Sequence, residues 1–221
     1  MITVHHLNNS RSQRILWLLE EIGVDYEIVR YQRDAETMRA PQELREAHPL
    51  GKSPLITDNG QTYAESAAII EYLVDTYGNQ LKPATHDVHY RDYVYWLHFS
   101  ESSLMPPLLV KLIGDRLTEA KVPFFVKPIV KSISKQMEAN FSGPEISSLL
   151  EYINNHLGKN TWFCGEGFSA ADIQMSFPLE ASAARAPGFS SYANIVSFVD
   201  RIHARPAYQA ALERGGEYDY A

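Results

Sequence analysis

Residues His48 to Leu73 read HPLGKSPLITDNGQTYAESAAIIEYL, and this stretch predicts a hairpin followed by a helix. Pro54 to Thr57 is apolar enough for a strand, and Gln61 to Ala64 is suited to pair with it. Between them, Asn59-Gly60 favours a two-residue type I′ turn, because both central residues of that turn need positive φ angles. The helix begins at Glu65-Ser66, after which apolar residues recur with the 3.6-residue period of a buried helical face.

Two positions in this stretch have chemistry beyond the fold. Pro54 lacks a main-chain N–H, so it stands at a strand start or an edge, and its bond to Ser53 is either trans or cis. A cis bond would leave the main-chain N–H and C=O of Ser53 free to pair with a peptide-like ligand. At Glu65-Ser66, a carboxylate, a hydroxyl and the N–H groups of a helix start either hold a ligand's ammonium and carboxylate or form an ordinary cap.

The residues before this stretch predict a strand–helix–strand unit. Ile2 to Leu7 is β-rich, and an apolar stripe from Arg11 to Ile22 predicts a helix that Gly23 ends. Tyr26 to Tyr31 forms the next strand, and a unit of this length implies a right-handed crossover with parallel pairing. With a weak helix around Pro41 to Leu44, the order is βαβ-α-ββα. This order predicts a thioredoxin-like α/β domain.

The second half predicts only helices. The stretch from Gly78 to Asp87 is rich in turn residues and has no periodicity, so we predict domains at 1–79 and 88–221 with a linker at 80–87. We expect the tail from Gly215 to Ala221 to be frayed. The expected helices are Val88–Leu112 with a bend at Pro106-Pro107, Val122–Phe141 with a kink at Pro128, Glu145–Leu157 after a break at Ser142-Gly143-Pro144, one starting at Ser169, Tyr192–His203 and Pro206–Arg214.

The composition excludes several classes of protein. Twenty Lys and Arg against 27 Asp and Glu give a net charge of −7, which disfavours a nucleic-acid partner. The sequence contains no apolar run long enough to span a membrane, and its first residues do not form a secretory signal. The single Cys164 excludes an internal disulfide and a CxxC redox pair, and it fits a reducing cytoplasm. His5, His6 and His48 do not have the spacing of a metal site.

Ser169 and Asp172 form an S-x-x-D capping box at the start of the fourth helix. In such a box the serine accepts from the main-chain N–H of the aspartate, and the aspartate reaches back to the serine. We interpret both residues as structural, because each already has a partner in the helix start. Cys164 follows Trp162-Phe163, and we interpret it as a buried, small apolar residue.

Three motifs resemble the cytosolic glutathione S-transferases, in particular the serine-type bacterial and fungal-like members. They are NNSRSQRILWLLEEIGVDYEI, GKSP followed by ESAAIIEYL, and FCGEGFSAADIQM, which lie in the family's order and span nearly the whole chain. Ser53 departs from the family, where valine is more common before the proline, but the expected contact comes from the main chain. The resemblance implies an enzyme of detoxification that uses glutathione as co-substrate without a metal, and it implies a homodimer.

The resemblance also implies which residues bind glutathione and act on it. In the family a Tyr, Ser or Cys after the first strand stabilises the glutathione thiolate, which identifies Ser10 as the candidate donor. Asn9 is the competitor, and without the family Ser10 would be a plain N-cap. The other contacts carried over by position are the Ser53 main chain beside Pro54 for the cysteinyl unit, Lys52 for the glycyl carboxylate, and Glu65 with Ser66 for the γ-glutamyl ammonium and carboxylate.

The resemblance places a pocket for a small apolar electrophile between the two domains. Our candidates for its lining are His98, Phe99, Ser102 and Met105, although aromatic and Met side chains at helical spacing are usually core. The implied reaction is glutathione addition to the electrophile, or glutathione-dependent reduction of peroxides or disulfides. The alternative is a non-catalytic binding module on the same fold.

Overall fold

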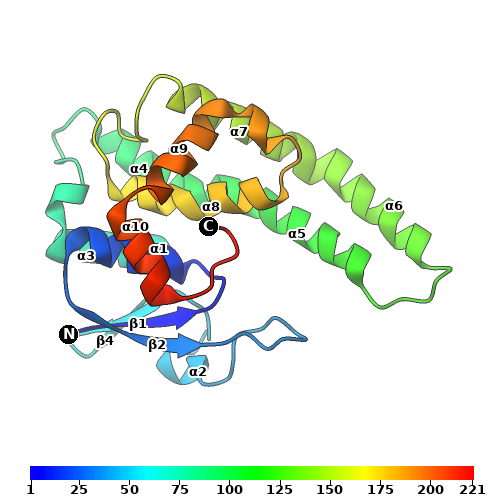
Figure 1. Ribbon diagram of the computed structural model, residues 1–221, viewed down its shortest axis with the longest axis horizontal. Coiled ribbons are helices and arrows are strands. Elements are labelled where there is room, and N and C mark those ends of the chain that lie inside the picture. The colour runs from blue at the N-terminus through cyan, green and yellow to red at the C-terminus, as the bar shows by residue number, and fades with distance from the viewer.

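The computed structural model describes residues 1–221, and its N-terminal part is built on a four-stranded mixed sheet (Figure 1). The strands are β1 (Ile2–Leu7), β2 (Tyr26–Tyr31), β3 (Leu55–Asp58) and β4 (Gln61–Ala64). They lie in the order β2-β1-β3-β4, with β1 parallel to β2 and the other neighbours antiparallel. The predicted βαβ-α-ββα order is confirmed, and β2 and β4 are the two edge strands.

The predicted type I′ turn of the hairpin is also confirmed. Asn59 and Gly60 have φ angles of 49° and 77°, as a type I′ turn requires. Leu55 pairs with Ala64, so the turn fixes the position at which β3 meets the helix that follows β4. Thus a turn encoded by two residues brings the start of that helix beside the start of β3.

Three helices accompany the sheet. They are α1 (Ser12–Ile22), the single turn α2 (Leu44–Ala47) and α3 (Ser66–Tyr77). Helix α1 contacts β1, α3, and α8 and α10 of the C-terminal half, so most of it is buried. Gly23 ends α1 with a φ angle of 78°, a conformation that favours glycine.

The rest of the chain is helical, with no strand after β4 (Figure 1). The long hairpin of α5 and α6 extends away from the sheet. The elements are η1 (Asn79–Leu81), α4 (Tyr90–Phe99), η2 (Ser100–Leu104), α5 (Met105–Glu119), α6 (Lys127–Met137), η3 (Glu138–Ser142), α7 (Gly143–Leu157), α8 (Ala170–Arg185), η4 (Phe189–Ser191), α9 (Ala193–His203) and α10 (Pro206–Gly215).

The predicted break at residues 142–144 is wrong. The π-helical segments η2 and η3 join α4 to α5 and α6 to α7 without interruption. Each π segment ends two residues before a proline, Pro106 or Pro144, whose ring would clash with the preceding turn of a regular α-helix. The kink expected at Pro128 is also absent, because α6 begins at Lys127 and Pro128 lies in its first turn.

The tail after α10 is docked, so the expectation that it is frayed is wrong. Tyr218 donates a hydrogen bond to Glu180 on α8 at 2.6 Å, and the hydroxyl of Tyr220 accepts one from Arg185 at 3.0 Å. Asp219 makes two hydrogen bonds with Asn9, 210 residues away in sequence. Side chains far from the tail in sequence therefore hold it across the start of α1.

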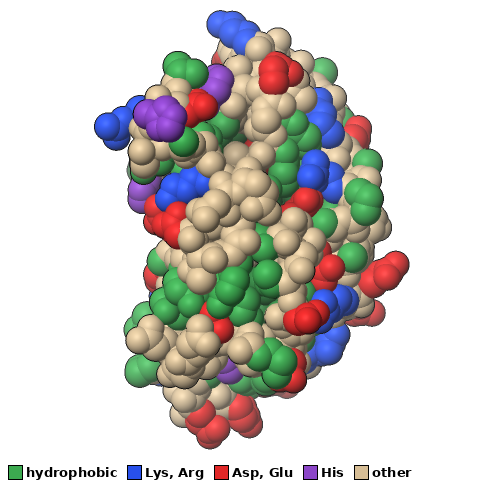
Figure 2. Space-filling model, turned by 90° about the vertical axis from the view of Figure 1, so that its left-hand side faces the viewer, with side chains coloured by type: hydrophobic (Ala, Val, Ile, Leu, Met, Phe, Trp, Pro, Cys, Tyr) green, Lys and Arg blue, Asp and Glu red, His purple; other side chains and the backbone are tan.

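One hydrophobic core of 40 buried residues runs through both halves. At its centre, the ring of Trp17 on α1 lies 5.7 Å from Phe168 and 5.2 Å from Tyr208. The proposed division at residues 80–87 stays a prediction, and η1 overlaps its first two residues. No helix in the structure is both long and apolar enough to cross a lipid bilayer. On the face shown in Figure 2, acidic and basic side chains are interspersed, and apolar side chains gather in its lower half.

Candidate functional site

The edge of the sheet carries a pocket between the two halves of the chain. It is formed where the loop before β3, the start of α3 and the start of α1 meet η2. The structure brings all five residues predicted to contact a tripeptide into this sheet-edge pocket. Its lining consists of Lys52, Ser53, Pro54, Glu65 and Ser66, together with Arg11, His48, Leu50, Leu55, Ala64 and Glu101.

Ser53 presents an unpaired main chain to this pocket. The Ser53-Pro54 bond is cis, which is one of the two forms that the sequence allowed. Neither the N–H nor the C=O of Ser53 takes part in a main-chain hydrogen bond, while its hydroxyl donates to the carbonyl oxygen of His5 at 3.2 Å. Ser53 therefore offers one donor and one acceptor to an extended peptide at the sheet edge.

The start of α3 forms the opposite wall. Glu65 has a φ angle of 71°, which turns the chain sharply from β4 into the helix, and its side chain is exposed. Ser66 is buried, and the first N–H groups of the helix have no partner within it. A carboxylate, a hydroxyl and helix N–H groups thus meet where an amino acid's ammonium and carboxylate can both be bound.

Ser10 lies just below the pocket and is not the N-cap of α1. The N-cap is Arg11, and its side chain makes no capping hydrogen bond. The hydroxyl of Ser10 is 4% exposed, lies 3.4 Å from the Ser53 hydroxyl, and accepts a hydrogen bond from the Ser12 N–H at 3.2 Å. This position puts a nearly buried hydroxyl beside the bend at Ser53.

A buried hydrogen-bond chain continues from Ser10 into the protein. The Ser10 and Ser12 hydroxyls are 2.7 Å apart, and the Ser12 hydroxyl is 2.9 Å from Nδ1 of His6. Burial and the positive charge of Arg30 lower the pKa of His6 to about 4, so its ring is neutral at neutral pH. The sequence pattern did not predict a role for Ser12 or His6, although both lie within four residues of Ser10.

Asn9, the competing thiolate donor, is held by the tail. Its side-chain amide donates to Asp219 at 2.7 Å and its side-chain oxygen accepts the Asp219 N–H at 2.9 Å. Both polar ends of this side chain therefore have a partner. Asn9 lines a second pocket rather than the sheet-edge pocket.

The second pocket has a volume of about 360 Å³ and adjoins the first, because Arg11 lines both. Of the predicted electrophile residues, only Met105 lines it. The structure does not bring the others there: His98 and Ser102 are exposed, and Phe99 packs in an aromatic cluster 5.0 Å from Trp96. Which side chains line the pocket depends on how each helix is rotated against its neighbours. The helical period of the sequence does not give this rotation.

The arginines that follow Ser10 serve different purposes. Arg14 is buried and does not line the sheet-edge pocket, and it donates to the carbonyl oxygen of Gln174 at 2.6 Å and to Glu101. Arg11 lies 3.3 Å from the same Glu101. Glu101 thus ties the start of α1 to η2 and closes one side of the sheet-edge pocket.

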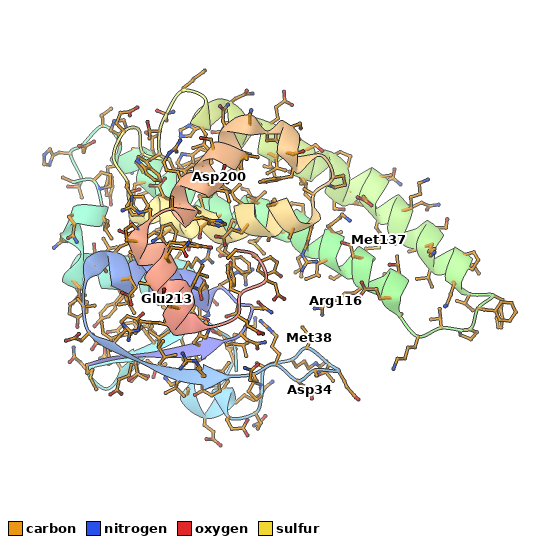
Figure 3. All side chains as sticks on the ribbon, in the orientation of Figure 1. Asp34, Met38, Arg116, Met137, Asp200 and Glu213 are labelled. Carbon is orange, nitrogen blue, oxygen red and sulfur yellow. The ribbon has the colours of Figure 1, made fainter.

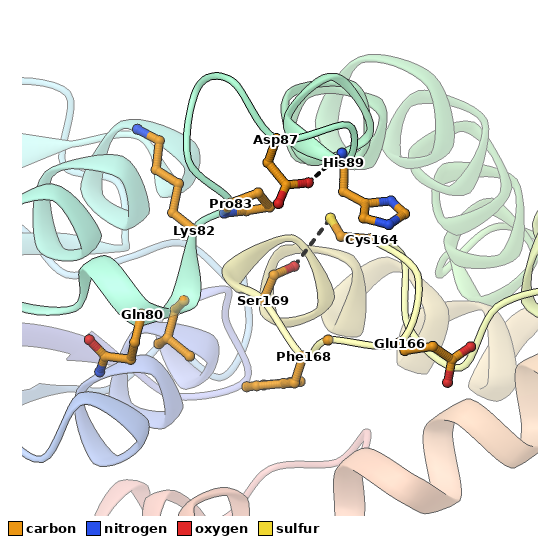
Figure 4. Close-up of a pocket in the computed structure, with 11 residues that line it drawn as sticks. Gln80, Lys82, Pro83, Asp87, His89, Cys164, Glu166, Phe168 and Ser169 are labelled. Carbon is orange, nitrogen blue, oxygen red and sulfur yellow. Dashed lines mark hydrogen bonds between the residues drawn. The ribbon is translucent and has the colours of Figure 1, made fainter.

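A third cavity lies beside the linker and contains Cys164 (Figure 4). The Cys164 sulfur accepts a hydrogen bond from Ser169 at 3.3 Å, and burial raises the pKa of its thiol to about 12. This thiol is therefore protonated and not nucleophilic at neutral pH. The structure contains no group of three or more His, Cys, Asp or Glu residues that could hold a metal ion.

Comparisons with known proteins agree with this arrangement. Residues 1–75 match the family described as "Glutathione S-transferase, N-terminal domain", and residues 113–206 match its C-terminal domain. The chain is 43% identical to glutathione S-transferase 3 of Schizosaccharomyces pombe, over 97% of this chain and 88% of the relative.

Solved structures share the fold. A glutathione S-transferase from Actinobacillus pleuropneumoniae is 34% identical, with a TM-score of 0.82 over 100% of this chain and 95% of that one. A sphingomonad glutathione S-transferase, solved with glutathione bound, is 21% identical, with a TM-score of 0.75 over 97% of this chain and 98% of that one. The architecture of this chain is therefore that of the solved enzymes.

Proposed function

This chain belongs to the glutathione S-transferase family and is a glutathione transferase, and from that premise we propose that it binds glutathione in the sheet-edge pocket. The unpaired main chain of Ser53 pairs with the cysteinyl unit, as an added strand does. Glu65 and Ser66 hold the γ-glutamyl ammonium and carboxylate, and Lys52 faces the glycyl carboxylate. The observation that carries this proposal is the convergence of all five residues on one pocket.

We assign the thiolate to Ser10. Only the thiolate attacks, and lowering a thiol pKa by two units takes about 2.7 kcal/mol of preferential stabilisation. A hydrogen bond to a charged group contributes about 1.5–3 kcal/mol, so one hydroxyl aided by a helix N-terminus suffices. The chain through Ser12 to His6 keeps the Ser10 hydroxyl in place, which supports Ser10 over Asn9.

The electrophile occupies the second pocket, next to Arg11. The thiolate sulfur attacks the electrophilic carbon, a sulfur–carbon bond forms, and the leaving group departs with its electron pair. Reduction of peroxides or disulfides would begin from the same thiolate, and assays with an organic hydroperoxide and a mixed disulfide measure that activity separately.

The test of the binding site is calorimetric titration with glutathione. We expect Glu65→Gln to raise the dissociation constant about tenfold or more, because it removes the negative charge opposite the ligand ammonium. Glu27→Gln is the matched control, since Glu27 is exposed on β2 at the opposite edge of the sheet. Equal affinities for the two variants, or no heat with the unmodified protein, would refute the proposed site.

We further propose a homodimer in the cytoplasm. Large apolar side chains are exposed on α6 and the loop before it, including Phe125 at 67% and Ile129 at 60%, and a partner subunit would bury them. The single Cys164 needs no oxidising compartment.

Light scattering after gel filtration tests the dimer. We expect twice the 25.0 kDa mass of one chain, and we expect Ile129→Ser with Ile133→Ser to favour the monomer, because the variant removes exposed apolar surface. Lys131→Ser on the same helix is the control. A mass of one chain for the unmodified protein at assay concentration would contradict the proposal.

A further inference from the structure

The second pocket combines an apolar wall with an unusual number of guanidinium groups. Helix α5 supplies half of the apolar wall, and the arginines come from four separate segments of the chain. The lining consists of Met38, Met105, Leu108, Leu109, Leu112, Phe177, Ala181 and Tyr220 on the apolar side, and Asn9, Arg11, Arg33, Arg116, Arg185 and Asp219 on the polar side.

Three of the four arginines have no carboxylate partner. Arg33 donates to the carbonyl oxygens of Asn8 at 3.2 Å and Met38 at 3.1 Å, which leaves its positive charge uncompensated. Arg185 donates to the hydroxyl of Tyr220, and Arg116 is exposed on α5 and makes no ion pair.

The guanidinium groups also act on one another. Burial lowers the pKa of Arg33, and the positive charges of Arg116 and Arg11 lower it further. Figure 3 shows Met38, on the loop after β2, facing Arg116 on α5 across the space between them. Positive charge thus reaches this pocket both from the loop after β2, through Arg33, and from α5, through Arg116.

One carboxylate lies in the pocket, and it does not neutralise these charges. Asp219 is held by two hydrogen bonds to Asn9 and forms no ion pair with an arginine. Of the four arginines that line the pocket, only Arg11 has a carboxylate partner, Glu101. The pocket is thus locally positive in a protein whose net charge is −7.

We propose that the second pocket selects electrophiles that carry a carboxylate or sulfonate group on an apolar body. The inference rests on the proposed function, because the pocket acts on an electrophile only if glutathione occupies the sheet-edge pocket. The leucine and methionine wall of α5 binds the apolar body. The unpaired guanidinium groups bind the anion, for which their planar, forked donors are well matched.

Two product analogues test this preference by calorimetry. S-(4-carboxybenzyl)glutathione and the analogue esterified only at the benzyl carboxylate have the same glutathione unit and can reach both pockets. They differ only in the charge on the benzyl group. We expect the carboxylate to bind about tenfold more tightly, with a preference that weakens as salt screens the guanidinium charges. The same preference is expected in kcat/KM for 4-chloro-3,5-dinitrobenzoate over its amide, after each is divided by its uncatalysed rate with glutathione.

A second test removes positive charge from the pocket by substitution. Arg116→Gln combined with Arg185→Gln is expected to abolish most of the preference, and both side chains lie outside the core, so the variant should fold. Arg91→Gln is the matched control, because Arg91 is exposed on α4 and does not line the pocket.

The outcomes separate the two proposals. Equal affinity for the charged and neutral analogues overturns the anion preference and leaves the proposed function standing. A preference that survives in the double variant overturns the assignment to these arginines. If neither analogue binds and glutathione itself does not bind, the proposed function is overturned, and the anion preference is overturned with it.

Discussion

Replacing Ser10 with alanine is expected to raise the thiol pKa of bound glutathione by about one to two units and to lower kcat by about 10- to 100-fold. The reason is the loss of one hydrogen bond to an anion, which contributes about 1.5–3 kcal/mol, and each 1.36 kcal/mol is worth a factor of ten. The thiolate absorbs in the ultraviolet, so a pH titration of the complex measures the shift directly.

Asn9→Ala separates the two candidate donors. Both the side-chain NH2 and the side-chain oxygen of Asn9 are hydrogen-bonded to Asp219. We therefore expect Asn9→Ala to leave the thiol pKa of bound glutathione close to its value in the unmodified protein. Ser12→Ala removes the partner that holds the Ser10 hydroxyl, and we expect a smaller shift in the same direction as Ser10→Ala. If Ser10→Ala changes neither the pKa nor the turnover, the assignment fails.

Replacing Asp172 with alanine is expected to lower the free energy of unfolding by about 2–4 kcal/mol while the activity of the folded protein is kept. The carboxylate is fully buried and accepts hydrogen bonds from the Phe163 N–H and the Ser169 N–H, each at 2.8 Å. The alanine variant leaves both N–H groups buried without a partner, at about 1–3 kcal/mol each. Denaturant unfolding measures the loss.

The same variant has a pH signature. Burial raises the pKa of Asp172 to about 6, so the folded protein keeps the proton between about pH 4 and 6 where the unfolded chain loses it. The stability of the unmodified protein, relative to Asp172→Ala, should therefore fall as pH rises through this window and level off above it. A difference that rises with pH would contradict this prediction.

Asp200→Ala is the control for position and charge. Asp200 is exposed on α9, where Figure 3 labels it, and its side chain makes no hydrogen bond or ion pair. We expect a change within about 0.5 kcal/mol. A loss as large as that of Asp172→Ala would mean that burial is not the cause.

The sequence alone predicted the features that depend on near neighbours in the chain. The Asn59-Gly60 turn, the glycine end of α1 and the start of α3 each need only the φ preferences and hydrogen bonds of a few residues. The residues expected to bind glutathione are grouped in sequence and lie within one loop–strand–turn–strand–helix unit. Their convergence on one pocket therefore followed once that unit formed.

Features that join distant segments were decided only by the tertiary structure. The second pocket needs α5, α8, the loop after β2 and the tail together, and of the four residues that the resemblance suggested for it only Met105 lines it. The tail is ordered by Asn9, Glu180 and Arg185, none of which is near it in sequence. Local preferences determined the hairpin, most of the helices and the grouping of the five glutathione-contact residues, because each depends on near neighbours in the chain. Packing between distant segments closed the sheet-edge pocket with Arg11 and Glu101 and determined the second pocket and its charge.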